Sequence, residues 1–271
     1  MGNRANGEEG FALVVVLAFL MLFAVFLTPF ATSARLQVLI SGNQFQTLRL
    51  GSAANALNDF LNWQINSDVR WREAAERGDL DKVGCTVGSL DLSVTIIPHA
   101  TLINLNTAEA PLLESGLQRL GINRESALKL VSEVLEFRTP RGYDGVGDGI
   151  SSGLKRAPFE DISEMHDFSL LRAIPIWSLA KVFSAWSGQS LLSVEDHAKG
   201  SSRHFTIASW LFEKGNVGSD AAVYAVGGAT ATKSRLATIS QDMGSEDGRT
   251  EMDCNELLGP KGVQVLAEIA G

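Results

Sequence analysis

The sequence has few cysteines, few prolines and fewer basic than acidic side chains. Two cysteines, Cys85 and Cys254, are too few for a disulfide-rich scaffold and too far apart for a zinc knuckle. Seven prolines in 271 residues exclude proline-rich and collagen-like repeats, although 26 glycines are present. With 23 basic against 31 acidic side chains, the chain lacks the positive charge of a nucleic-acid-binding protein. Its apolar content of 45% is enough for a folded core in one or two domains.

Motifs that carry catalysis or metal binding are also missing. The four histidines are scattered, and none has a second ligand-type residue at metal-binding spacing. Neither a Gly-x-Ser-x-Gly elbow nor a phosphate-binding lysine loop is present, and no nucleophile with a neighbouring base can be recognised. These absences favour a protein that is not an enzyme.

A long apolar segment stands near the beginning of the chain. Residues 10–34 carry no charge, and 20 of the 24 residues from Phe11 to Ala34 are apolar. As a helix these 24 residues would be about 36 Å long, enough to cross a hydrocarbon core of about 30 Å. The sequence therefore predicts a transmembrane helix over residues 11–34.

Two interpretations of this segment are open, and both export the rest of the chain. One is a retained membrane anchor behind a short leader, residues 1–10. The other is a secretory signal that is removed after Ala34. The uninterrupted apolar run of residues 11–27 is longer than the usual signal core, which favours the anchor.

After residue 34 the apolar positions are confined to one face of a predicted helix. Spacing at i, i+3, i+4 and i+7 predicts an amphipathic extension of the helix over residues 35–67. Its apolar members are Leu36, Leu39, Ile40, Leu50, Ala53, Ala54, Leu57, Phe60 and Leu61. One helix is expected to run from about residue 11 to about residue 65.

The rest of the chain predicts a small antiparallel sheet that is interrupted by a helical block. Strands are predicted over residues 90–97, 204–212, 221–226 and about 235–239, and helices over residues 107–120, 123–137, from 161 and about 176–186. The predicted fold class is α+β: a long N-terminal helix packs on the sheet, and a large helical domain is inserted in the sheet. The predicted boundaries are 68–100 for the first half of the α/β part, 101–195 for the insert and 196–271 for the second half.

A glycine-rich loop at residues 141–156 contains Asp144 and Asp148. Together with flanking carboxylates at Glu136, Glu160 and Asp161, their oxygens could converge on a calcium ion. The spacing does not match an EF-hand, so we interpret the loop as a solvated acidic turn. Asp144 and Asp148 stay as calcium candidates, and no other cofactor is expected.

The two cysteines lie in the sequence on either side of the predicted insert. If this part of the chain is exported, its compartment is oxidising, and a bridge between Cys85 and Cys254 would stabilise the fold. The alternative is two unrelated buried thiols. We favour the bridge.

Two stretches together resemble a known family. Residues 9–17, Glu-Gly-Phe-Ala-Leu-Val-Val-Val-Leu, look like the prepilin-peptidase processing region of pilins and pseudopilins. Residues 102–108, Leu-Ile-Asn-Leu-Asn-Thr-Ala, and 156–165, Arg-Ala-Pro-Phe-Glu-Asp-Ile-Ser-Glu-Met, look like the inserted helical domain of the K-type minor pseudopilins of type II secretion. The resemblance spans roughly residues 9 to 240 and implies a pilin-like fold.

The resemblance implies cleavage by prepilin peptidase between Gly10 and Phe11, followed by methylation of the new amine. The fifth residue counted from Phe11 is Val15, where most pilins carry a glutamate. Members of the K type resemble this chain in lacking that glutamate. An ionised carboxylate in hydrocarbon is costly unless it is paired, and a subunit at a filament tip has no partner ahead of it.

The family further implies a non-enzymatic subunit at the tip of the periplasmic pseudopilus, anchored in inner-membrane lipid with its C-terminal domain in the periplasm. Its expected partners are the I-type and J-type minor pseudopilins and the major pseudopilin, bound chiefly through the amphipathic half of the helix. A type IV pilus minor subunit is an alternative within the wider family.

A second resemblance points to another class of protein. The Asn104–Ala108 and Pro158–Met165 pattern is also similar to helix-hairpin-helix modules, including those of membrane-anchored DNA-uptake receptors. Such modules need a glycine hairpin whose amides approach phosphate, with basic residues around it. Here the turn at residues 120–123 has one glycine and the chain is acidic, so no nucleic acid is expected as a partner.

Overall fold

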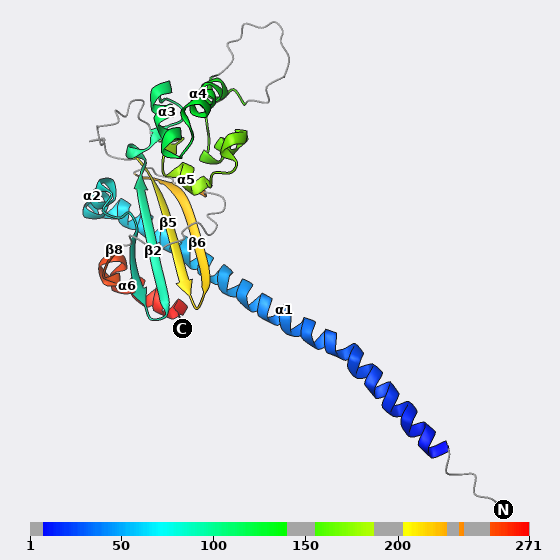
Figure 1. Cartoon of the computed structure of the whole chain (residues 1–271). Coiled ribbons are helices and arrows are strands. Elements are labelled where there is room, and N and C mark those ends of the chain that lie inside the picture. Colours follow the sequence, from blue (N-terminus) through cyan, green and yellow to red (C-terminus); the bar gives the residue numbers. More distant parts are fainter. Residues whose placement is uncertain (1–7, 140–154, 187–202, 227–232, 236–249, 271) are drawn as a thin grey trace, which may run out of the picture. The chain divides into compact units, whose positions relative to one another are not determined.

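The computed structural model describes residues 8–139, 155–186, 203–226, 233–235 and 250–270, with the side chains of 8–12, 27–32, 233–235 and 269–270 left aside. The chain divides into two compact units, residues 1–49 and residues 50–271. Each unit is described by itself. One helix, α1 (Glu8–Ser67), contributes to both of them (Figure 1).

The first unit consists of α1 up to Arg49. All its described side chains from Leu13 to Phe26 are exposed, and the large apolar ones are 50 to 75% accessible. Among the described residues, no helix has an apolar stretch long enough to cross a membrane. The predicted transmembrane segment includes residues 11–12 and 27–32, whose side chains lie outside that description.

The second unit is built on a six-stranded sheet with the order β7-β6-β5-β2-β1-β8 (Figure 1). Its strands are β1 (Val83–Val87), β2 (Leu90–Pro98), β5 (His204–Glu213), β6 (Asn216–Ala225), β7 (Lys233–Arg235) and β8 (Thr250–Glu251). The α+β class with a helix on a sheet is confirmed. Neighbouring strands are antiparallel except for β8, which is parallel to β1. The sheet is therefore mixed rather than purely antiparallel.

β5 is buried on both faces because the sheet is covered on both sides. Its odd-numbered residues Phe205, Ile207 and Leu211 pack in a core with α1. Its even-numbered residues Ala208 and Trp210 pack in a second core with the helical insert. Successive side chains of a strand point to opposite faces, so one strand serves both cores.

The first core is made by the second unit's part of α1 and by α6 (Cys254–Ala270) against the sheet. The buried members from α1 are Leu50, Ala53, Ala54, Leu57, Leu61 and Ile65. They keep the spacing that the sequence predicts for an amphipathic helix. The short helix α2 (Val69–Arg77) follows α1 and adds the buried Ala75.

The disulfide Cys85–Cys254 ties β1 to the start of α6, with 5.4 Å between the two Cα atoms. It closes a sequence separation of 169 residues, which includes the whole insert. The C-terminal helix is thereby held against the same sheet as α1. The helix bends at Gly259, whose φ is 68°, just before Pro260.

The insert occupies the chain between β2 and β5. Its described elements are η1 (His99–Thr101), β3 (Ile103–Asn104), α3 (Ala110–Arg119), α4 (Arg124–Arg138), η2 (Ile162–Asp167), η3 (Ser169–Leu171), α5 (Ile176–Ala180) and β4 (Phe183–Ser184). A parallel pair, β3 with β4, joins its beginning to its end. The predicted helical insert in the sheet is confirmed.

Two predicted helices of the insert are wrong in detail. The segment from Asp161 forms the six-residue 3-10 helix η2, in which the Asp161 carboxylate accepts from the Ser163 amide. The sequence also favours a capping box between Asp161 and Glu164, but the Glu164 carboxylate bonds to Lys155 instead. The helix predicted over residues 176–186 ends at Ala180, since the chain then enters β4.

Candidate functional site

The predicted processing site lies at the beginning of α1. Gly10 and Phe11 belong to the first turns of the helix, and their side chains lie outside the described ones. Val15 is half exposed in the first unit. Cleavage after Gly10 stays a prediction.

The predicted partner-binding face of α1 is buried in one part and exposed in another. Over residues 50–65 the apolar stripe is covered by the protein's own sheet, so the expectation that this part binds other subunits is wrong. Hydrophobic periodicity predicts that a face is buried and does not name its partner. The large apolar residues that stay exposed in the extension are Leu36, Val38, Leu39, Ile40, Phe45, Leu48 and Trp63.

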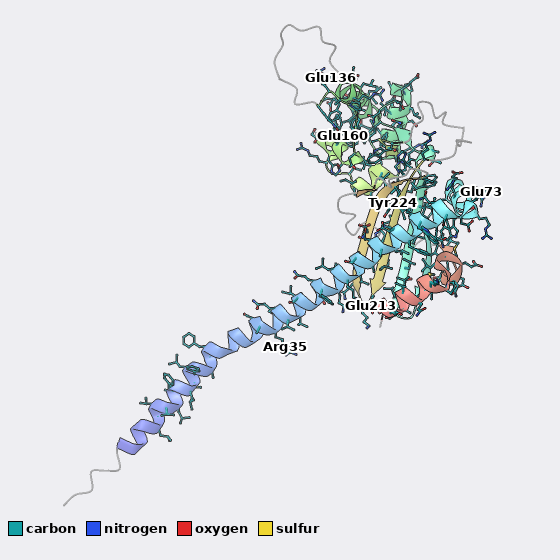
Figure 2. All side chains as sticks on the ribbon, turned by 180° about the vertical axis from the view of Figure 1, so that it is seen from behind. Arg35, Glu73, Glu136, Glu160, Glu213 and Tyr224 are labelled. Carbon is teal, nitrogen blue, oxygen red and sulfur yellow. A yellow bond between two sulfur atoms is a disulfide. The ribbon has the colours of Figure 1, made fainter. Side chains whose placement is uncertain are left out.

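A buried polar contact sets the position of α1 on the sheet. The Asn58 side chain is fully buried, and its amide donates to the backbone oxygen of Asp220 at 2.9 Å and to the Asp220 carboxylate at 3.1 Å. The Ser209 hydroxyl donates to the Asn58 oxygen at 2.5 Å. Next to it, the Tyr224 hydroxyl donates to Asp59 at 2.9 Å. Figure 2 labels Tyr224 beside α1. Because buried polar groups are costly without partners, these bonds favour one register of helix and strands.

The backbones of α1 and β6 touch where the second unit begins. A Cβ atom on Gly218 would stand 2.3 Å from the backbone nitrogen of Gly51 and from the backbone carbon of Leu50. Only a residue without a side chain fits there. No local pattern predicts this contact, because 167 residues separate Gly51 from Gly218.

The two asparagines of the Leu102–Ala108 motif hold the insert together. The Asn104 side-chain oxygen accepts from the amides of Asn106 and Thr107. Asn106 exchanges a pair of bonds with the backbone of Phe159 and donates also to the carbonyl of Ala185. One side chain thus joins three segments of the insert, and Phe159 belongs to the second stretch that carries the family resemblance.

Arg138, at the end of α4, ties the same motif to the helices. Its guanidinium donates to the carbonyl oxygens of Leu105 and Ala108, each at 2.7 Å. Burial lowers the pKa of Arg138, although an arginine stays charged at any physiological pH. The motif residues therefore have a structural role that their side-chain bonds explain.

The helix-hairpin-helix resemblance corresponds to α3, the turn at residues 120–123 and α4. Gly121 takes a left-handed conformation with φ of 84°, and the Asn123 side chain caps α4 by accepting from the Ser126 amide. The facing sides of both helices are buried in the insert core. Two arginines flank the turn: Arg119 is exposed, and Arg124 is paired with Glu114 at 3.1 Å.

The calcium candidates Asp144 and Asp148 lie outside the described residues. Carboxylates that flank their loop are paired with cations: Glu136 with Arg156, and both Glu160 and Glu164 with Lys155. The hydrogen bond to Glu164 raises the pKa of Lys155, which keeps this ammonium charged. Within the described part of the chain, no group of three metal-ligating side chains comes together.

A serine and a histidine that the sequence analysis did not connect are in contact inside the protein. The Ser184 hydroxyl lies 2.7 Å from Nδ1 of His99, and the Thr206 hydroxyl lies 2.7 Å from its Nε2. All three side chains are at most 2% exposed, so a substrate has no access to them. Their sequence separations of 85 and 107 residues explain why no motif pointed to them.

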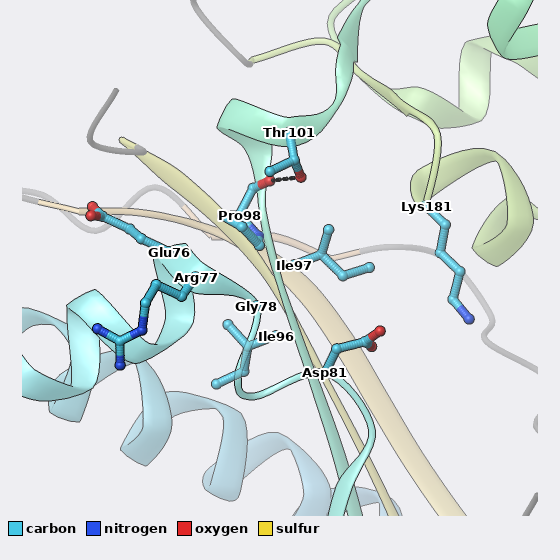
Figure 3. A pocket seen from close by; sticks show the side chains of 9 residues that line it. All are labelled: Glu76, Arg77, Gly78, Asp81, Ile96, Ile97, Pro98, Thr101 and Lys181. Carbon is cyan, nitrogen blue, oxygen red and sulfur yellow. Dashed lines mark hydrogen bonds between the residues drawn. The ribbon is translucent and has the colours of Figure 1, made fainter. Parts of the chain in front are cut away.

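A groove of about 370 Å³ lies between the end of α2, the end of β2 and Lys181. The Asp81 carboxylate and the Lys181 ammonium face it from opposite sides (Figure 3). Burial lowers the pKa of Lys181, and the charge of Asp81 partly offsets that effect. The Lys181 ammonium also stands 5.0 Å from the centre of the Trp177 ring. This side chain thus has an aromatic and an anionic neighbour from the protein itself.

The chain has little likeness to known sequences. No protein-family model matches it, and neither does any curated protein. Among solved structures it is similar to a chain in the crystal structure of the GspK-GspI-GspJ complex from the enterotoxigenic Escherichia coli Type 2 Secretion System. The TM-score is 0.41 and the identity 11%, over 76% of this chain and 100% of that chain. This is a distant structural similarity to a component of a type II secretion complex, and it places the chain in no family.

Proposed function

We propose that this chain is a minor pseudopilin of the K type, a structural subunit at the tip of the periplasmic pseudopilus of type II secretion. The observation that carries the proposal is a combination within one chain. A helix that begins at a prepilin-like processing motif packs its second part on a sheet, and a helical insert separates β2 from β5. Neither the motif nor the fold is specific alone.

The role of such a subunit is assembly rather than catalysis. Residues 11–34 would hold it in the inner membrane with its C-terminal domain in the periplasm. A tip subunit has no partner for a carboxylate at position 15, and Val15 in place of a glutamate would avoid an unpaired charge in hydrocarbon. Packing against the I-type, J-type and major pseudopilins would use the apolar residues between 36 and 48, which are exposed in the first unit.

Processing is the sharpest test of the proposal. When the full chain is expressed together with a prepilin peptidase, N-terminal sequencing of the membrane-extracted protein should begin at Phe11. Gly10→Val should leave the leader in place, while Gly7→Val is the matched control and should be processed normally. A mature protein that begins at Arg35 would be a secreted protein and would contradict the filament role.

Partner binding tests the second half of the proposal. Co-purification with I-type and J-type pseudopilins should be lost in Leu39→Asp, because a charge is placed on an exposed apolar position. Gln37→Asp adds the same charge at a polar position and should keep the partners. Equal binding by both variants would remove residues 36–48 from the interface.

The DNA-uptake receptor is the second candidate, and the α3–turn–α4 hairpin is the observation that favours it. Retention of duplex DNA by the full chain, weakening as salt rises from 50 to 200 mM, would support the receptor. Absence of DNA binding by the full chain at low salt would exclude the receptor function. The full chain is needed because residues 50–65 belong to the core.

A further inference from the structure

A buried polar cluster, which we term the His99 joint, consists of His99, Ser184 and Thr206. Both ring nitrogens of His99 are engaged, Nδ1 with the Ser184 hydroxyl and Nε2 with the Thr206 hydroxyl. Ser184 also accepts from the backbone amide of Trp186 at 2.9 Å. The proposed function makes no use of this cluster.

The three residues come from the points where the insert leaves and rejoins the sheet. His99 follows the last residue of β2, Ser184 ends β4, and Thr206 lies near the start of β5. The imidazole of His99, at the start of the insert, therefore forms hydrogen bonds with β4, the last strand of the insert, and with β5, the strand to which the chain returns. The joint therefore lies where the insert is attached to the sheet, beside the second core that packs the insert on β5.

The bonding pattern suits a neutral ring. A neutral imidazole offers one donor and one acceptor, and each hydroxyl can take the complementary role. Protonation of His99 would place a positive charge in this buried position. Among the described residues, the titratable group that faces it is His204, with 6.1 Å between the ring centres, and the hydrogen-bond partners of the ring are hydroxyls rather than carboxylates. The other ring beside it is that of Trp186, at 6.2 Å.

Burial, together with a smaller effect of the charge of His204, lowers the pKa of His99 to about 3. Burial also lowers the pKa of His204 itself. A histidine in the unfolded chain has a pKa near 6.5. The stability contributed by neutral His99 is therefore fully present above pH 6.5, and it is lost progressively as the pH falls from 6.5 toward 3.

We propose that the His99 joint is an acid-sensitive attachment that frees the insert from the sheet when His99 becomes protonated. This inference is independent of the proposed function. The released state exposes the imidazole to water, where it takes up a proton. Each pH unit below 6.5 should then raise the equilibrium constant for opening about tenfold, until other groups titrate.

Hydrogen exchange of the Trp186 amide measures the opening, because this amide donates to Ser184 within the joint. In the full chain in detergent, we expect its protection factor to fall about tenfold from pH 6 to pH 5. Amides shared by β5 and β6 should keep their protection. A Trp186 protection factor that does not change between pH 7 and pH 5 would overturn the proposal.

His99→Gln is the informative variant, since glutamine offers a donor and an acceptor but does not titrate. The pH dependence of Trp186 protection should disappear in it. His166→Gln, at a histidine of the insert that bonds to the carbonyl of Ile174, should keep the wild-type dependence. An unchanged slope in His99→Gln would overturn the proposal.

A direct measurement on the wild type covers the case in which His99→Gln does not fold. With isotope-labelled histidine, the ring signals of His99 should stay those of a neutral imidazole down to pH 5 in the folded protein. A His99 ring that titrates near pH 6.5 while the insert remains attached would contradict an acid-sensitive joint.

Discussion

Two stretches of α1 carry similar apolar patterns, yet only one of them is buried. In residues 50–65 the six apolar side chains that face the sheet are at most 7% exposed, whereas the large apolar side chains of residues 36–48 are 55 to 71% exposed. The first stretch faces the sheet of its own unit, and the second belongs to a unit that consists of helix alone. The comparison teaches that one amphipathic helix can bury one part of its apolar pattern in the fold and leave another part exposed.

The largest expected effect comes from a charge placed in each stretch. Leu61→Asp puts a carboxylate in the core and removes a fully buried side chain, so we expect a loss of about 4 kcal/mol or more of unfolding free energy. Leu39→Asp, at an exposed position of the other stretch, should cost less than about 1 kcal/mol. Urea unfolding of both variants in detergent measures the difference. Similar losses would show that residues 36–48 also carry folding contacts.

Two glycines differ in how closely other atoms approach them: Gly218 lies against the backbone of α1, and Gly42 has open space around it. Gly218→Ala should destabilise the protein by roughly 3 kcal/mol, because its Cβ would overlap the backbone of α1. Gly42→Ala, with nothing within 4 Å of the added atom, should instead stabilise the helix by about 1 kcal/mol. Thermal unfolding followed by circular dichroism should shift in opposite directions for the two variants. A tolerated Gly218→Ala would mean that α1 can move away from β6.

A smaller effect is expected from the polar contact that positions α1. Asn58→Ala leaves Ser209 and Asp220 without their buried partner, which should cost about 2 kcal/mol. Asn62→Ala, four residues later, removes an exposed bond with Asn66 and should cost less than about 0.5 kcal/mol. Equal costs in chemical unfolding would show that the Asn58 bonds do not contribute specifically.

Prediction from sequence worked where a local pattern is strong. The strands at residues 90–97 and 204–212 are confirmed, as is the helical insert between them. The helix predicted over residues 123–137 is observed one residue later, as Arg124–Arg138. The first half of β6 was missed because residues 216–220, apart from Val217, are polar or glycine. There a two-residue turn, Lys214–Gly215, with positive φ at both positions, sets the pairing of β6 with β5.

Other elements were missed because their stability depends on distant partners. β1 and β8 are short, and β8 pairs with β1 across a separation of more than 160 residues. α6 contains Gly259 and Pro260, which argue against a helix locally, while the disulfide and the core of the second unit hold it in place. The residues of the His99 joint could not be found in this way, since a lone histidine has no pattern.

The amino-acid sequence alone is sufficient for the apolar helix, its amphipathic extension, the α+β class and the position of the insert, because these follow from periodicity and turn residues within short windows. The folded structure decides which part of the stripe is covered by the sheet, where the backbones of α1 and β6 touch, and which hydroxyls surround His99. The contacts that decide these points join residues as far apart as Asn58 and Asp220, 162 positions along the chain, and packing at that range depends on the whole chain at once.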